Sequence, residues 1–167
     1  MLNKSIISLI ALSFFIISAT TQAEERKTYY DNGNLKAIAN FENGELEGEA
    51  KAFYENGKLQ AIENYKNGIL DGERKFFYEN GKLQAIGNYK NGKAEGEAKD
   101  FYENGKLQAI GKFKNGKAEG ERKFFYENGK LKAIENYKNG KPIEGYMYDM
   151  NGKKTKMTEA HLYNIMQ

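Results

Sequence analysis

Residues 78–92 read Tyr78-Glu79-Asn80-Gly81-Lys82-Leu83-Gln84-Ala85-Ile86-Gly87-Asn88-Tyr89-Lys90-Asn91-Gly92 and decide the fold. This segment contains two Asn-Gly pairs, which are eleven residues apart. An Asn-Gly pair between strand-like stretches favours a type I′ hairpin turn, because both central residues then need a positive φ angle, which Asn tolerates and Gly adopts without strain. The stretch between the two pairs has the length of a strand and is too short for an ordinary helix. The segment therefore predicts consecutive β-hairpins.

The same pattern recurs along the chain with a period of 24 residues. One aromatic series opens an element ending in Asn-Gly, and its members are Tyr30, Tyr54, Tyr78, Tyr102 and Tyr126. A second series precedes the other Asn-Gly pair of each unit, and its members are Phe41, Tyr65, Tyr89, Phe113 and Tyr137. We predict an all-β fold, a single-layer, elongated antiparallel β-meander over residues 24–157 with two strands per unit. It would have about twelve strands of roughly seven residues and a length of about 55 Å.

Strand pairing around the turns predicts which residues share a face of the sheet. If Asn80-Gly81 is a two-residue loop, Tyr78 pairs with Leu83 and Phe76 with Ala85, and paired residues lie on the same face. One face is then an aromatic and aliphatic ladder, and the other is charged with an apolar stripe. Extended apolar surface marks contact sites. The binding residues predicted on the ladder face are Tyr54, Phe76, Tyr78, Leu83, Tyr89, Tyr102, Leu107, Phe124 and Tyr126.

Alternate units differ at one position of this ladder face. Arg74 and Arg122 occupy it in two units, whereas Ala50 and Ala98 occupy it in the other two. Duplication of a double unit explains the alternation. The functional alternative is a pair of cationic docking points about 19 Å apart, which is four strand spacings. Arg74 and Arg122 therefore join the predicted binding residues.

Residues 24–167 lack the side chains of common catalytic sites. They contain no cysteine and no serine, and His161 is their single histidine. This inventory excludes nucleophilic Ser–His and Cys–His pairs and a zinc site of His and Cys ligands. The carboxylates form identical rows, each with a lysine two residues on, whereas a catalytic pair needs two different environments. We predict a charge ladder of Glu49, Glu73, Glu97 and Glu121, and no enzyme activity, metal, cofactor or small-molecule substrate.

The charge pattern argues against a nucleic-acid partner. The chain has 26 basic and 23 acidic residues, a net charge of +3, and the two signs are interspersed. Nucleic-acid-binding proteins instead gather lysine and arginine on one face or stripe. Contact with a membrane or an envelope polymer stays open, because basic and aromatic rows can hold anionic headgroups or stack on sugar rings. The near-balance of charge counts against purely electrostatic attachment to a membrane.

Residues 1–23 differ in composition from the rest of the chain. Lys4 gives a short basic start, residues 6–17 are apolar apart from serine, and residues 19–23 supply small side chains before a cleavage point after Ala23. This layout predicts a secretory signal peptide. The alternative is an uncleaved membrane anchor, although the apolar run is shorter than the roughly 20 residues that span a bilayer. No cysteine follows the cleavage point, so we expect an exported protein of the periplasm, the outer envelope or the exterior, and not a lipoprotein.

Residues 158–167 break the repeat pattern. Thr158 precedes a stretch that predicts a short helix, with this threonine as its N-cap. Repeat arrays need atypical ends that cover an exposed edge strand. We therefore predict a C-terminal cap at residues 158–167, with His161 on its surface.

Residues 85–96 read Ala85-Ile86-Gly87-Asn88-Tyr89-Lys90-Asn91-Gly92-Lys93-Ala94-Glu95-Gly96, and residues 109–116 repeat much of this pattern. The unit resembles the MORN repeat (membrane occupation and recognition nexus), in its bacterial variant, over about residues 29–152. The departures are an alanine in place of the leading aromatic residue, and Glu63, Glu135 or Ala39 in place of the first glycine. The resemblance implies a β-repeat fold. It also implies scaffolding, protein binding or membrane association, and the variant occurs in proteins labelled as antitoxin components.

These observations together predict an exported, non-catalytic repeat protein. Its expected role is a protein-interaction or scaffold module at the cell envelope or outside the cell, with a protein partner or a second copy bound on one sheet face. The alternatives are a module that associates with a membrane or an envelope polymer, and an antitoxin-like or immunity-like partner-binding protein.

Overall fold

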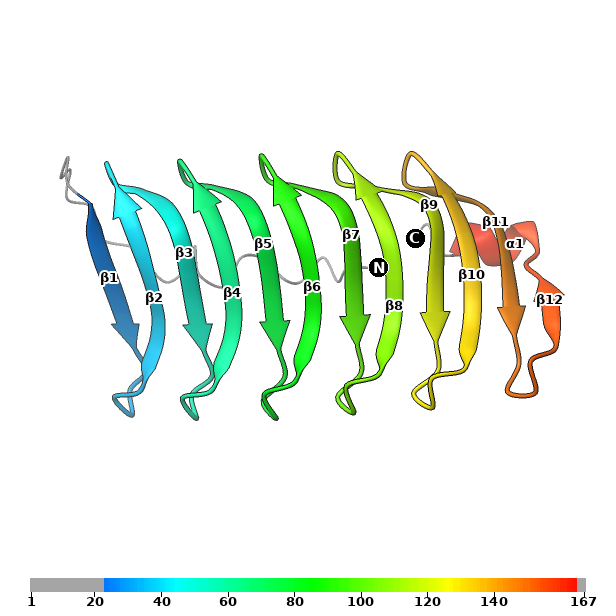
Figure 1. The fold of residues 1–167 in the computed structure, drawn as a ribbon, viewed down its shortest axis with the longest axis horizontal. Helices are drawn as coiled ribbons and strands as arrows, with labels where there is room; N and C mark the ends of the chain where they lie inside the picture. The colour runs from blue at the N-terminus through cyan, green and yellow to red at the C-terminus, as the bar shows by residue number, and fades with distance from the viewer. Residues whose placement is uncertain (1–22, 165–167) are drawn as a thin grey trace.

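The computed structural model describes residues 23–164 as one twelve-stranded antiparallel sheet followed by a short helix (Figure 1). The strands pair in sequence order, so the sheet is a continuous meander. The predicted all-β, single-layer fold is confirmed, with strands of 8 and 9 residues within the units rather than seven. The elements are β1 (Glu24–Tyr29), β2 (Leu35–Glu42), β3 (Glu45–Phe53), β4 (Leu59–Lys66), β5 (Ile69–Phe77), β6 (Leu83–Lys90), β7 (Lys93–Phe101), β8 (Leu107–Lys114), β9 (Lys117–Phe125), β10 (Leu131–Lys138), β11 (Lys141–Tyr148), β12 (Lys154–Lys156) and α1 (Glu159–Asn164).

The two Asn-Gly turns of a unit have different conformations. Between β6 and β7, Asn91 and Gly92 have φ angles of 49° and 74°, as a type I′ turn requires. Between β5 and β6, Gly81 has a φ of 85° and donates its N–H to the carbonyl of Tyr78 at 2.8 Å, and the Tyr78 N–H donates to the Lys82 carbonyl at 2.9 Å. That pattern is a three-residue loop built on a type I turn with a glycine bulge. The predicted two-residue loop is therefore confirmed between β6 and β7 and wrong between β5 and β6.

The longer loop shifts the strand pairing by one residue, and a bulge then restores it. Phe77, and not Tyr78, is the Cα partner of Leu83, so that predicted pair is wrong. The next pair is Phe76 with Ala85, as the ladder prediction requires, because the residue between Leu83 and Ala85 is left over as a bulge. The error is thus confined to the end of the hairpin.

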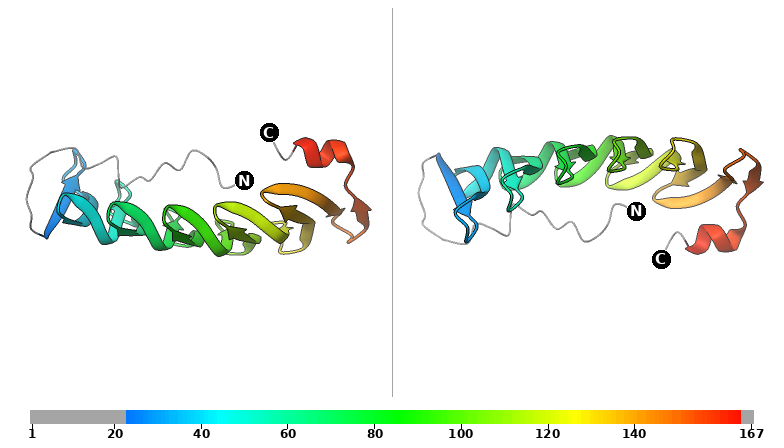
Figure 2. Two further views of the ribbon diagram at one scale, coloured as in Figure 1. Left: turned by 90° about the horizontal axis from the view of Figure 1, so that it is seen from above. Right: turned by 90° about the horizontal axis from the view of Figure 1, so that it is seen from below.

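A larger bulge bends the sheet once in each unit. Asn88 pairs with Glu95 and Ile86 pairs with Lys99, so β7 has two more residues than β6 over the same interval. Gly96 lies within this extra length at a φ of 80°, a left-handed conformation that glycine adopts without steric cost. The pairs β2–β3, β4–β5 and β8–β9 show the same shift. The strands are accordingly bowed, as the views from above and below show (Figure 2).

The left-handed asparagine of the type I′ turn gives a direct test of turn chemistry. We expect Asn91→Val to lower the free energy of unfolding by about 1–2 kcal/mol, because a β-branched residue is strained at its φ of 49°. The matched control is Asn88→Val, which changes an exposed residue within β6 and should leave stability unchanged. Urea unfolding followed by circular dichroism measures both. Equal losses in the two variants would contradict the assignment of this turn.

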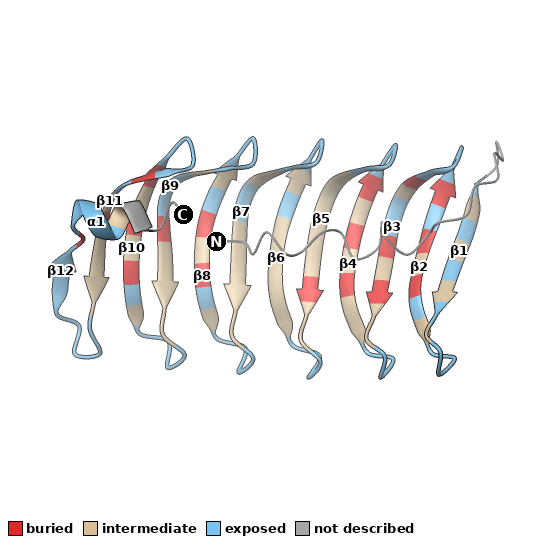
Figure 3. Cartoon of the chain, turned by 180° about the vertical axis from the view of Figure 1, so that it is seen from behind, coloured by how far each residue is buried: buried red, intermediate tan, exposed pale blue. Residues whose placement is uncertain are grey.

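Burial in the sheet is uneven, and Figure 3 shows buried positions concentrated in β2–β5 with fewer in β8–β11. Small side chains alternate with aromatic ones in the buried cluster, so neighbouring strands cover one another. Its members are Ala39, Phe41, Leu46, Ala50, Ala52, Ala61, Tyr65 and Phe76. Such an array is held together by contacts between neighbouring strands rather than by a central core.

The C-terminal segment forms the predicted short helix. Thr158 Oγ1 accepts the N–H of His161 at 3.3 Å, which is the N-cap interaction, and His161 is exposed. Met157 is buried, and a Cβ on Gly145 would lie 2.6 Å from the Met157 sulfur and 3.4 Å from a methyl carbon of Leu162. The cap therefore packs on the face of β11, and not across the edge of β12 as terminal caps of arrays are expected to do.

The predicted signal peptide lies outside the described residues apart from Ala23, and β1 begins at Glu24, directly after the predicted cleavage point. Within residues 23–164, no helix has the length and apolar character needed to cross a membrane.

Candidate functional site

The face of the sheet on which α1 packs, called here the inner face, carries rows of side chains that run across the strands. The central row takes one residue from each strand from β1 to β11, and it contains all three arginines of the chain. Strand pairing and the close contacts of the glycines define its order. Its members are Arg26, Ala39, Ala50, Glu63, Arg74, Gly87, Ala98, Gly111, Arg122, Glu135 and Gly145.

Two further rows flank the central row. The upper row, nearer the type I′ turns, contains the aromatic residues of the even-numbered strands, which are Phe41, Tyr65, Tyr89, Phe113 and Tyr137. The lower row contains Thr28, Ala37, Ala52, Ala61, Phe76, Ala85, Asp100, Ala109, Phe124, Ala133 and Met147.

The central row and the lower row are mirror-symmetric about β7. From β4 to β10 the central row reads Glu-Arg-Gly-Ala-Gly-Arg-Glu, with Ala98 at its centre. Over the same strands the lower row reads Ala-Phe-Ala-Asp-Ala-Phe-Ala, with Asp100 at its centre. In the middle of the inner face, at β6–β8, the central row therefore has only the small residues Gly87, Ala98 and Gly111, which we call the low floor. Larger side chains border it on both sides and form its two walls, Arg74 with Phe76 and Arg122 with Phe124.

The opposite, outer face is the predicted charge ladder. Glu49 lies 2.8 Å from Lys51, Glu97 lies 2.8 Å from Lys99, and each carboxylate is about half exposed. The remaining pairs are Glu73 with Lys75 and Glu121 with Lys123. The lysine of Glu97 lowers the pKa of that carboxyl by hydrogen bonding and by its charge. Exposed pairs of this kind contribute little to stability. Because the pairs are alike in every unit, none of them marks a particular functional site.

The repeated tyrosines predicted as binding residues hold neighbouring units together. The hydroxyl of Tyr78 donates to the carbonyl of Phe101 at 2.6 Å, across to the next unit. The same bond occurs from Tyr54 at 2.7 Å, from Tyr102 at 2.6 Å and from Tyr126 at 2.9 Å. Burial raises the pKa of the hydroxyls of Tyr54, Tyr78 and Tyr102. Leu83 and Leu107 are the first residues of β6 and β8, and they pair with Phe77 and Phe101 rather than with the tyrosines.

Arg74 turns toward β4 and is paired there. Its Nε lies 2.6 Å from Glu63 Oε1, and the other carboxylate oxygen accepts the Tyr65 hydroxyl at 2.8 Å. The Glu63 side chain is 0% exposed and that of Arg74 is 11% exposed. The guanidinium also lies 4.4 Å from the centroid of Phe76 and 5.6 Å from that of Tyr89. Arg74 is therefore one half of a buried ion pair, and not an isolated cationic docking point.

Arg122 turns toward β7 and lies across a glycine. Its Cγ is 2.8 Å from where a Cβ on Gly111 would be, so only glycine leaves room for this side chain. The Nη2 atom reaches to 3.7 Å from Asp100 Oδ2, and the guanidinium lies 4.8 Å from the centroid of Phe124. Burial raises the pKa of Asp100, and the charge of Arg122 opposes that shift.

The carboxylates at the two ends of the mirror arrangement are each bonded by a tyrosine. The Tyr137 hydroxyl donates to Glu135 Oε2 at 2.5 Å, as Tyr65 does to Glu63. Burial raises the pKa of Tyr137, and the hydrogen bond and charge of Glu135 add to that effect. Glycine takes the place of the glutamate in β6, so Tyr89 has no carboxylate at the corresponding position.

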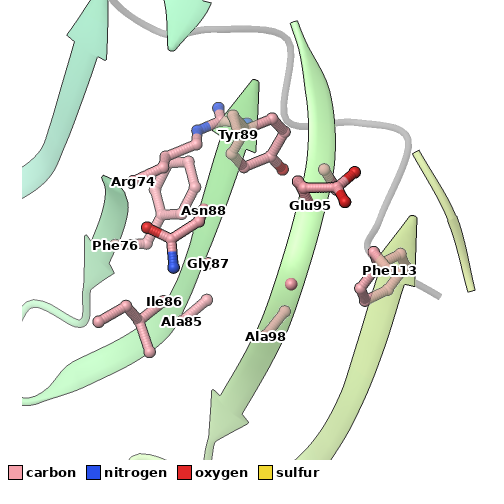
Figure 4. Close-up of a pocket in the computed structure, with 12 residues that line it drawn as sticks. Arg74, Phe76, Ala85, Ile86, Gly87, Asn88, Tyr89, Glu95, Ala98 and Phe113 are labelled. Atoms are coloured by element: carbon pink, nitrogen blue, oxygen red, sulfur yellow. The ribbon is translucent and has the colours of Figure 1, made fainter. Parts of the chain in front are cut away.

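A hollow opens on the inner face beside Gly87, over β5–β8. A Cβ on this glycine would meet only Ala98 within 4 Å, at 3.4 Å. The hollow is shallow and open to solvent, with a cavity volume of about 20 Å³. In Figure 4, Phe76 and Tyr89 stand on one side of Gly87 and Ala98, and Phe113 stands on the other.

The structure separates the predicted binding residues into two groups. Arg74, Phe76 and Tyr89 line the hollow, and Arg122 and Phe124 form the opposite wall of the floor. The four repeated tyrosines and the two leucines lie at the ends of the strands instead. Sequence reasoning missed the roles of Gly87, Gly111 and Asp100. The sequence did contain a signal for Asp100, because the equivalent residues of the neighbouring units, Phe76 and Phe124, are both phenylalanine.

No group of three or more His, Cys, Asp or Glu side chains placed to hold a metal ion occurs among residues 23–164. The described part of the inner face carries aromatic rings, glycines and paired charges.

An uninterrupted single-layer meander with two hairpin turns per 24-residue unit defines the class of β-repeat proteins. More narrowly, the chain belongs to the MORN repeat variant family, whose pattern matches residues 25–43, 46–67, 70–91, 94–115 and 118–139. None of the curated proteins compared with the chain matches it.

Several solved structures contain a similar segment. The crystal structure of TarM is 20% identical over 71% of this chain and 21% of that protein, with a TM-score of 0.34. The GtfA/B complex bound to UDP and GlcNAc is 9% identical over 71% of this chain and 24% of that chain, with a TM-score of 0.27. Accessory secretory proteins 1, 2 and 3 of Streptococcus pneumoniae give 15% identity over 74% and 18%, with a TM-score of 0.22. This chain spans less than a quarter of the length of each, and at these TM-scores the similarity supports no statement about activity or ligand.

Proposed function

We propose that this protein is an exported, non-catalytic binding and scaffold module that contacts a protein partner with its inner face. The observation that carries the proposal is the low floor at β6–β8. There the central row has only Gly87, Ala98 and Gly111, and among the described elements only α1 packs on this face, at β11. Aromatic side chains around a floor that no described strand or helix covers are the arrangement that contact sites use. The predicted signal peptide supports an exported location.

The face assignment can be tested in cells by site-specific photo-crosslinking. A benzophenone amino acid placed at Phe113 samples the inner face, and the same group placed at Phe101 samples the outer face of the adjacent strand. We expect crosslinked partner from position 113 and none from position 101, because Phe113 lines the hollow on the inner face. Light scattering of the purified protein then shows whether the partner is a second copy.

Either of two results would count against the inner face. Equal crosslinking from positions 113 and 101 would indicate contact without a preferred face. Crosslinking from position 101 alone would assign binding to the charged outer face and favour the alternative of an envelope polymer or a membrane.

A further inference from the structure

The two halves of the mirror-symmetric floor are filled differently. In the half at β8, the side chain of Arg122 lies across Gly111 and reaches Asp100. In the half at β6, Arg74 turns away toward Glu63, and no side chain except that of Ala98 lies within 4 Å of a Cβ position on Gly87. The hollow in Figure 4 is this unfilled half.

The filled half shows which chemistry the floor accepts. Arg122 places its aliphatic stem on a glycine, its guanidinium 3.7 Å from a carboxylate oxygen and its charge 4.8 Å from the centroid of Phe124. The unfilled half repeats the glycine floor at Gly87, and its corresponding ring is Phe76, whose centroid lies 4.4 Å from the guanidinium of Arg74. Asp100 serves both halves, because it lies in the lower row midway between the two phenylalanines.

The charges of the floor leave room for one more cation. Along the central and lower rows from β4 to β10 there are three carboxylates and two guanidiniums, which leaves one negative charge. These groups are Glu63, Arg74, Asp100, Arg122 and Glu135. A cation that is removed from water binds best where a carboxylate and an aromatic face meet it together.

The proposed function supplies the source of this cation. A partner protein presents a guanidinium on an arginine side chain, which has the same stem and charge as Arg122 in the filled half. The guanidinium of Arg74 stays paired with Glu63 at the border of the hollow.

We propose that the Gly87 half of the inner face binds an arginine side chain of a partner protein. The stem lies on Gly87 and Ala98, and the guanidinium reaches Asp100 between the aromatic side chains that line the hollow. This inference rests on the proposed partner-binding function and names the chemistry that the inner face recognises.

Nuclear magnetic resonance titration of the purified, processed protein tests the site with a defined probe. The probe is the peptide acetyl-Gly-Arg-Gly-amide, and the comparison peptides carry lysine or citrulline in place of arginine. We expect saturable shifts of the Gly87 and Ala98 amide signals with a dissociation constant on the order of millimolar. The citrulline peptide, which has the shape without the charge, should bind at least tenfold more weakly.

Two variants on one strand give matched controls. Asp100→Asn removes the carboxylate of the floor and should weaken the arginine peptide at least tenfold, whereas Glu97→Gln changes the outer face of β7 and should not affect binding. Circular dichroism of each variant shows that the sheet is intact. Unchanged affinity in Asp100→Asn, or equal affinity for the citrulline peptide, overturns the proposal. Equal affinity for the lysine peptide overturns the assignment to guanidinium.

The outcomes also separate this inference from the proposed function. Crosslinking from position 113 together with no shift by the arginine peptide would leave the inner face as the binding surface and refute the arginine site. Shifts at Gly87 that appear on raising the protein concentration alone would identify a second copy as the occupant and refute the assignment to a different partner protein.

Discussion

Replacing Glu63 with glutamine is expected to lower the free energy of unfolding by about 3–5 kcal/mol. The carboxylate is 0% exposed and pairs with Arg74 at 2.6 Å, and it also accepts the Tyr65 hydroxyl at 2.8 Å. Glutamine keeps the shape but removes the charge, so the guanidinium of Arg74 is left without its counter-ion in a site where its side chain is 11% exposed. A buried charge without its partner costs far more than the pair contributes. Urea unfolding of the processed protein measures the loss.

The control for this prediction is Glu49→Gln on the outer face. Glu49 also pairs with a basic residue, Lys51 at 2.8 Å, but its side chain is 49% exposed and water screens the charge. We expect no measurable loss from this change. A double variant, Glu63→Leu with Arg74→Met, should recover most of the stability, because neither charge then remains buried. Similar losses from Glu63→Gln and Glu49→Gln would refute the role assigned to the buried pair.

Changing Tyr54, Tyr78, Tyr102 and Tyr126 together to phenylalanine is expected to destabilise the array by about 2–6 kcal/mol. Each hydroxyl donates to a backbone carbonyl of the next unit at distances from 2.6 Å to 2.9 Å. A hydrogen bond of this kind contributes about 0.5–1.5 kcal/mol, and the loss leaves a half-buried carbonyl without its donor. Thermal unfolding followed by circular dichroism measures the combined effect.

The tyrosine prediction has a control in the same chain and a dependence on pH. Tyr29 is 59% exposed, and Tyr29→Phe should leave the melting temperature unchanged. Burial raises the pKa of Tyr54, Tyr78 and Tyr102 above the ordinary value of 10.0. The stabilisation that these hydroxyls contribute is therefore complete when the pH is below the ordinary pKa of tyrosine. It is lost as the pH rises through the raised pKa values of the folded state. A fourfold variant that melts like the unchanged protein but fails to bind its partner would instead make these tyrosines contact residues.

The hairpins and the two faces of the sheet were predictable because they depend on local rules. Side chains alternate along a strand, and a turn fixes the register, so Phe76 and Ala85 were placed together from spacing alone. The loop at Asn80 was mispredicted because the same dipeptide serves two turn types. In the pair Asn91-Gly92 both residues take a left-handed conformation, whereas in the pair Asn80-Gly81 only the glycine does. Dipeptide composition does not distinguish these cases, since the difference lies in the hydrogen bonds of the flanking residues.

The candidate site was only partly predictable, because its pattern runs perpendicular to the chain. Arg74 and Arg122 were identified from their alternation with alanine, but their partners come from other strands. Glu63 was identified as a departure from the repeat, and Asp100 was not singled out at all. The symmetry about β7 is formed by seven strands from four successive units, and it becomes visible only when the register, with its bulges, is known.

The central row also makes the distance between its arginines depend on the number of repeats. Arg74 and Arg122 are four strand spacings apart, about 19 Å. Inserting one 24-residue unit between them would add two strands and lengthen this separation to about 29 Å, without altering any turn or bulge. Deleting one unit would shorten it by the same step. A gene with such repeats can therefore adjust the spacing of side chains on the inner face in fixed increments by gaining or losing whole copies, while single substitutions such as glutamate to glycine decide which strands carry a charge.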